Sequence, residues 1–187
     1  MMCLPAGVGL IRPGGGGGGG AWFTSANLGL YSASSAGWGG YTLRQVIPAS
    51  AMAAGSRIRV LLASAGSPPV QAVIGKAYLG RQAASGDAYD FDSTPEQLLF
   101  AGSPSVGFPG NVAMYSDALI TPITASAYVL AVYFSSATTV AHFTTGATGF
   151  ADYYTLGDDA ATVNASGYTL GANNRSLLVG RVDIWQP

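Results

Sequence analysis

The stretch "YTLRQVIPASAMAAGSRIRVLLA", residues 41–63, carries the pattern that decides the fold. In its second half Ile58, Val60 and Leu62 alternate with other residues, so they fall on one face of an extended chain. Residues 41–47 alternate with the same period of two, which is typical of half-buried β-strands. The connecting "PASAMAAG", residues 48–55, is too short for a stable helix and predicts a turn or a single helical turn.

The rest of the chain repeats short apolar runs bounded by Gly, Pro, Ser or Asp. Eight further runs are expected to be strands: 70–80, 97–100, 105–108, 112–120, 127–134, 138–144, 150–155 and 175–184. No run has a sustained 3.6-residue period. We therefore predict an all-β fold, an antiparallel two-sheet β-sandwich or jelly roll with a glycine-rich N-terminal extension. Its predicted core comprises Leu43, Ile58, Val60, Leu62, Leu130, Val132, Leu178 and Val182.

The N-terminal extension contains seven consecutive glycines at residues 14–20. Glycine has no side chain to bury, so the run is either a flexible tether or a place where several backbones pack closely. Before it, Leu4, Val8, Leu10 and Ile11 form an apolar stripe that predicts attachment to another protein. The expected organisation is an attachment segment at 1–20, an aromatic Ser/Gly-rich lead at 21–40 and a sandwich domain at 41–187.

Charged residues make up only 9% of the chain, against about 25% in ordinary soluble domains. The net charge of −1 excludes an electrostatic nucleic-acid binder, because no basic patch is left to neutralise phosphates. No apolar run reaches the length of a membrane span, and the N-terminal residues lack the pattern of a signal peptide. A surface made of Ser, Thr, Gly, Ala and Tyr is typical of particle-bound β-proteins, so we expect a virion protein assembled in a host cytoplasm.

Residues suited to catalysis are few. His142 is the only histidine, no serine lies in a G-x-S-x-G motif, and no Cys/His cluster suggests zinc. We therefore expect a protein that is not an enzyme and has no cofactor. Asp87, Asp90 and Asp92 in "GDAYDFD" offer oxygen ligands for calcium, or are loop carboxylates that bond the local backbone.

Aromatic side chains next to carboxylates occur in two glycine-punctuated segments, "SGDAYDFD" and "GFADYYTLGDDA". Tyrosine combines a flat apolar ring with a polar hydroxyl, which suits stacking on a sugar while bonding its hydroxyls. Cross-strand packing of aromatic residues is the alternative interpretation. The predicted ligand-binding residues are Tyr89, Asp90, Asp92, Tyr153, Tyr154 and Asp158.

Four stretches within residues 41–135 together resemble the β-sandwich domain that accompanies some GDSL-type (SGNH) esterases: "YTLRQVIPASAMAAGSRIRVLLASAG", "AYLGRQAASGDAYDFD", "QLLFAGSPSVGFPGNVAMYSDAL" and "AYVLAVYF". No GDS motif and no D-x-x-H pair occurs in the chain, so no catalytic residues carry over. The resemblance implies the accessory sandwich alone, a glycan-facing module.

Isolated sandwiches behind glycine-rich segments also resemble structural proteins of tailed phages and phage-like gene transfer particles. That resemblance implies a non-enzymatic virion protein (a fibre, spike or decoration protein) that binds a glycan or host surface. Its expected partners are other virion proteins and copies of itself, a trimer being the simplest arrangement. A purely structural cement or tail-assembly protein is the alternative, and a carbohydrate-active hydrolase acting through Asp90 or Asp158 is a weaker one.

Overall fold

The computed structural model describes residues 19–65 and 71–187, and their regular structure is almost entirely β-strand. The predicted attachment residues Leu4, Val8, Leu10 and Ile11 lie outside the described residues, as do residues 14–18 of the glycine run. The strands are β1 (Ala21–Asn27), β2 (Ala33–Ala36), β3 (Tyr41–Ile47), β4 (Arg57–Ala63), β5 (Gln71–Arg81), β6 (Glu96–Gln97), β7 (Val106–Pro109), β8 (Ala113–Tyr115), β9 (Tyr128–Phe134), β10 (Thr139–Phe143), β11 (Ala151–Leu156), β12 (Thr169–Asn173), β13 (Ser176–Leu177) and β14 (Val179–Gln186). A 3-10 turn at Ala49–Ala51, inside the segment expected to be a turn, is the helical element of the described residues.

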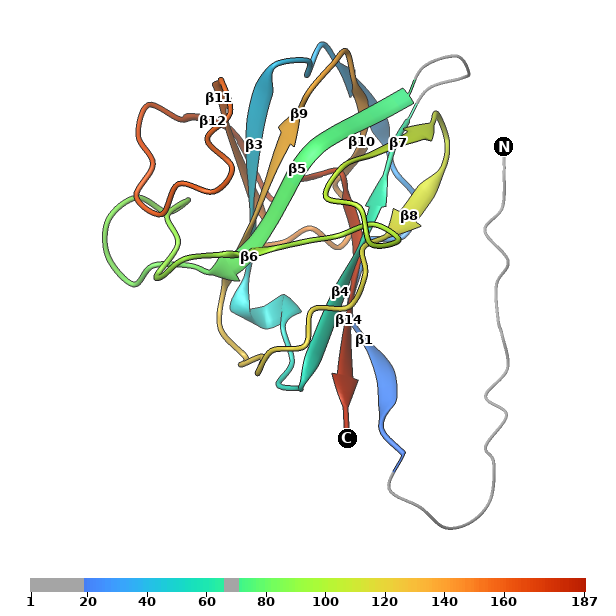
Figure 1. The fold of residues 1–187 in the computed structure, drawn as a ribbon, viewed down its shortest axis with the longest axis vertical. Coiled ribbons are helices and arrows are strands. Elements are labelled where there is room, and N and C mark those ends of the chain that lie inside the picture. Colours follow the sequence, from blue (N-terminus) through green and yellow to red (C-terminus); the bar gives the residue numbers. More distant parts are fainter. Residues whose placement is uncertain (1–18, 66–70) are drawn as a thin grey trace.

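The strands form two layers (Figure 1). The large sheet has the order β12-β11-β3-β9-β5-β6, and β7 also pairs with β5. The second layer combines two smaller sheets, ordered β1-β14-β4-β8 and β13-β10-β2. Leu178 joins these two, because its N–H donates to Ala141 and its carbonyl accepts from Ala63, each at 2.8 Å. All named strand pairs are antiparallel, so the predicted two-sheet antiparallel sandwich is confirmed.

The main hydrophobic core lies between the two layers. All eight residues predicted for it are fully buried and belong to one cluster. In β4 the buried residues Ile58, Val60 and Leu62 alternate with partly exposed ones, as the period of two requires. Leu178 keeps its buried place although its backbone has a φ of 73°, which breaks the last strand into β13 and β14. The predicted core is therefore confirmed.

The lead at residues 21–40 is part of the sandwich, so the structural unit begins earlier than the expected boundary at Tyr41. Strand β1 pairs with β14 along its whole length, and β2 pairs with β10. Leu28 and Trp38, also from this lead, join the core cluster with 1% and 8% exposure. Sequence reasoning missed both strands because their small and polar residues show no alternation: β1 reads "AWFTSAN" and β2 reads "ASSA".

On the outer face of the second layer, an aromatic and arginine stack attaches the edge strand β1. The Arg59 guanidinium lies 4.4 Å from the Trp22 ring centroid and 4.2 Å from that of Tyr115. Beneath it, the buried Asp183 carboxylate accepts hydrogen bonds from Arg59 and Arg181. Burial favours a raised pKa for Asp183, but the hydrogen bonds from Arg181, Tyr115 and Arg59 outweigh it and hold that pKa below its usual range. The stack thus connects β1 to β4 across β14.

Candidate functional site: an aromatic hollow at the edge of the sandwich

Two loops, residues 82–95 and 157–168, cover the outer face of the large sheet and lie side by side (Figure 1). Arg44, on the central strand β3, is fully buried beneath them. Its guanidinium donates to the carbonyls of Tyr89, Asp159 and Thr162. Nothing in the sequence pattern distinguishes Arg44 from the other residues of its strand.

Tyr89 and Asp90, two of the predicted ligand-binding residues, hold the two loops together and against the sheet. One Asp90 carboxylate oxygen accepts from the Asp87 N–H at 3.1 Å, and the other accepts from the Ala165 N–H at 2.9 Å. The Tyr89 ring stacks on Tyr168 at 4.8 Å and lies 5.0 Å from Tyr153. Burial raises the pKa of Tyr168 to about 12, against the opposing effect of Arg44. Tyr89, Asp90 and Tyr153 therefore lie together, but their polar and aromatic contacts connect the two loops to the sheet.

The other predicted residues lie elsewhere, so the six do not form one surface. Tyr154 follows Tyr153 in β11 and consequently points to the opposite side of the sheet, where it packs against the main core. Asp158 is ion-paired with Lys76 at 2.6 Å. Asp92 faces Arg81 at 3.5 Å.

The carboxylates considered for calcium do not gather into a ligand set. The structure contains no group of three or more acidic, histidine or cysteine side chains suited to a metal within residues 19–65 and 71–187. Both Asp90 oxygens accept main-chain N–H groups, one from Asp87 in the same loop and one from Ala165 in the neighbouring loop. The bond from Asp87 matches the alternative interpretation, a loop carboxylate that bonds the local backbone.

A different group of aromatic side chains converges where the two layers meet at an open edge. We call this the edge hollow; it is open to solvent, has a volume of about 370 Å³ and is lined by Ser35, Ala36, Gly37, Trp38, Tyr41, Tyr154, Gly171 and Arg175. Strand β2 of the second layer contributes one wall, and β3, β11 and β12 of the large sheet contribute the other. Its volume lies within the usual range for small-molecule sites, about 300–1,000 Å³.

Three rings form the aromatic part of the edge hollow. Trp38 lies 6.1 Å from Tyr41 and 5.6 Å from Tyr154, and the two tyrosines are 6.2 Å apart. All three pairs are edge-to-face, the arrangement that the charge distribution of aromatic rings favours. The Trp38 indole N–H donates to Ser35 at 3.1 Å, which fixes the ring orientation. The rings consequently hold one another in a fixed arrangement.

An arginine provides the polar part. The Arg175 guanidinium donates from Nε at 2.7 Å and from Nη2 at 2.5 Å to the two oxygens of Asp152, which is fully buried. Gly171 makes room for this pair, because a Cβ there would stand 2.0 Å from the Asp152 carboxylate. Nearby, burial and the positive charge of Arg175 lower the pKa of His142, and Asp152 opposes that shift. Burial and the Arg175 charge both favour the neutral form of His142.

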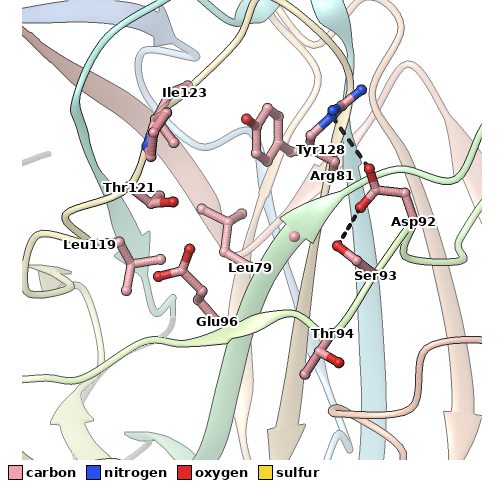
Figure 2. A pocket seen from close by; sticks show the side chains of 12 residues that line it. Leu79, Arg81, Asp92, Ser93, Thr94, Glu96, Leu119, Thr121, Ile123 and Tyr128 are labelled. Atoms are coloured by element: carbon pink, nitrogen blue, oxygen red, sulfur yellow. Dashed lines mark hydrogen bonds and ion pairs between the residues drawn. The ribbon is translucent and has the colours of Figure 1, made fainter.

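A second, smaller hollow of about 150 Å³ opens beside β5 and β6 (Figure 2). Figure 2 shows Glu96 on one side of Leu79 and the Arg81–Asp92 pair on the other. Asp92 also accepts a hydrogen bond from the Ser93 hydroxyl at 2.9 Å. This hollow is below the size of typical small-molecule sites and has no aromatic cluster, so the edge hollow is the stronger candidate.

Sequence reasoning included Tyr154 but missed Trp38, Tyr41 and Arg175 as site residues. Tyr41 was visible only as one position of an alternating strand, and Arg175 as the first residue of another. The sequence signal for Trp38 was "GWGG" at residues 37–40, directly before a strand. Glycines on both sides of a tryptophan indicate a turn that carries a large ring.

Within the described residues, no helix is long and apolar enough to cross a bilayer. The edge hollow is assigned on its geometry alone, because no protein-family model matches the chain and no curated protein sequence matches it.

Proposed function

We propose that the chain is a non-enzymatic structural protein of a virus particle that binds a glycan, and that the edge hollow is the binding site. One observation carries the glycan part: Trp38, Tyr41 and Tyr154 converge on an open hollow beside the Arg175 guanidinium. Aromatic rings offer flat apolar surface to the C–H faces of a sugar. The tyrosine hydroxyls and the guanidinium offer hydrogen bonds to its hydroxyl groups.

Sequence features support the virion part of the proposal. Low charge and abundant small polar residues suit a protein that remains soluble through assembly, and an apolar stripe before a glycine run suits attachment. The resemblance of such sandwiches to phage and gene-transfer-particle proteins points the same way. The trimer remains the simplest expected arrangement.

A hydrolytic role is not part of the proposal, because both carboxylates considered for it have structural partners. Asp90 is buried and accepts two main-chain N–H bonds. Asp158 is ion-paired with Lys76. A general acid or base needs a carboxyl group that can reach a substrate proton.

Replacing Tyr41 with alanine in the full-length chain should weaken binding to a glycan array by on the order of tenfold, since one of the two partly exposed rings of the hollow is lost. Tyr31→Ala is the matched control, because Tyr31 is an exposed tyrosine that does not line the hollow. It should leave binding unchanged. Melting curves of both variants verify the fold. Equal glycan binding by wild type and Tyr41→Ala, with both folded, would contradict the assignment of the site.

The purely structural alternative has one observation in its favour. The outer face of the second layer presents Trp22, Trp185, Tyr115 and Arg59 in one continuous stack. Tryptophan, tyrosine and arginine are enriched at protein–protein contacts. Under that alternative the chain is a cement or tail-assembly protein, and its principal contacts are with neighbouring proteins.

Deleting residues 1–20 should leave the melting temperature nearly unchanged but abolish incorporation into particles. The reason is that glycines bury no side chain, whereas the apolar stripe is expected to contact the particle. Co-sedimentation of the chain with particles measures incorporation. As a matched variant of full length, the combined replacement of Leu4, Val8, Leu10 and Ile11 with serine should also abolish incorporation into particles. Full occupancy by the truncated chain would show that the segment is a dispensable linker.

A further inference from the structure

We infer that the edge hollow selects neutral sugars over acidic ones. The inference rests on the proposed glycan-binding function and names the class of sugar that the same site takes. It follows from the charges that line the hollow and from the hydrogen bonds that these groups already make.

Arg175 is the only charged residue among the eight that line the edge hollow. Its charge is balanced by Asp152, which lies beneath it with a fully buried side chain and accepts hydrogen bonds from Nε and Nη2. Because these two nitrogens donate to the two carboxylate oxygens, the pair is bidentate, which is the strongest arrangement of these groups. The hollow is therefore electrically neutral although an arginine lines it.

The groups that remain free suit hydroxyl groups. Arg175 Nη1 makes no hydrogen bond to the described residues and remains available as a donor. The hydroxyls of Tyr41 and Tyr154, which also line the hollow, make no hydrogen bond to the described residues. Each hydroxyl can both donate and accept. A sugar hydroxyl likewise donates and accepts, so it is a suitable partner for any one of these groups.

An acidic sugar lacks a comparable partner. Its carboxylate would lose water on entering the aromatic hollow, and the cost of desolvating a charge is recovered only with an opposite charge that is free to pair. The carboxylate of Asp152 already balances the guanidinium charge, so the free Nη1 offers a hydrogen bond but no net positive charge. A second carboxylate near Arg175 would also be repelled by the first.

The test uses the full-length chain and pairs of labelled oligosaccharides. Each pair consists of a neutral hexose trisaccharide and its analogue with a terminal C6 carboxylate in place of the hydroxymethyl group. We expect the wild type to bind the neutral member on the order of tenfold more tightly. Equal or tighter binding of the acidic member overturns the inference and leaves the proposed function intact. If no oligosaccharide of either kind binds, both the inference and the proposed function fail.

Two variants alter the charge of the hollow. Ala36 lines it on β2 and is exposed, so Ala36→Lys adds a positive charge without touching the buried pair. Ala36→Lys should bind the acidic members about two- to fivefold more tightly at low salt, and Ala36→Gln, the matched neutral control, should not. Asp152→Asn removes the charge that balances Arg175 and should shift the preference further toward the acidic members. Circular dichroism verifies the fold of this variant. An unchanged preference in a folded Ala36→Lys variant contradicts the inference.

Discussion

Replacing Arg44 with alanine is expected to lower the free energy of unfolding by about 3–5 kcal/mol. The Arg44 side chain is fully buried on the outer face of the large sheet. It donates to the Tyr89 carbonyl at 2.8 Å and to the Asp159 carbonyl at 3.0 Å, and it also bonds the Thr162 carbonyl. Alanine would leave the Tyr89 and Thr162 carbonyls without this donor, whereas the Asp159 carbonyl would keep the bond from the Thr162 N–H. It would also open a cavity beneath both covering loops.

Stacking adds to the expected effect. The guanidinium lies 4.7 Å from the Phe91 ring centroid and 5.2 Å from that of Tyr168, so one aromatic residue of each loop packs against it. Part of the loss is offset, because no carboxylate among the described residues pairs with Arg44 and its Nε has no partner. Removing a buried charge recovers its desolvation cost. The net effect remains destabilising since several buried groups depend on this one side chain.

Urea unfolding followed by fluorescence measures the change, and limited proteolysis of residues 82–95 and 157–168 reports whether the loops open. Arg44→Met separates packing from hydrogen bonding, because it retains much of the apolar volume, and it should lie between alanine and the wild type. Arg57→Ala is the matched control: Arg57 is exposed and its guanidinium lies 5.5 Å from the Trp185 ring centroid, so the loss should stay under about 1 kcal/mol. A similar small loss for Arg44→Ala would contradict the proposed role of Arg44.

Replacing Leu130 with alanine should cost about 2–5 kcal/mol through lost burial and the cavity that remains. Leu130 is fully buried in β9, at the centre of the large sheet between β3 and β5. It lies in register with Gln45 on one side and Leu79 on the other, so its neighbours cannot easily close the space.

Thermal and urea unfolding measure this change as well. Ile120→Ala is the control, since Ile120 is 77% exposed and should lose no more than about 0.5 kcal/mol. A loss of less than 0.5 kcal/mol for Leu130→Ala would mean that β9 does not have the register described.

The sequence alone was sufficient for the fold class and the main core. Residues 57–63 and their counterparts alternate with a period of two, and in an extended chain this places every second side chain on one face. Burial of Ile58, Val60 and Leu62 followed directly, as did that of Leu130 and Val132. Alternation is a local property of the chain, so it can be read without knowing which strands are neighbours. Strands β1, β2 and β12 have no clear alternation, and for that reason they were not predicted.

Only the tertiary structure decided which aromatic side chains meet. Tyr153 and Tyr154 are adjacent in sequence, yet they lie on opposite sides of the large sheet, one beneath the loops and the other at the edge hollow. Trp38 and Tyr154 are far apart in sequence, and they come together because the edges of two layers meet there. Such proximity depends on strand order and on loops folding back over a face. Both are set by contacts between distant segments, which the local pattern of residues does not encode.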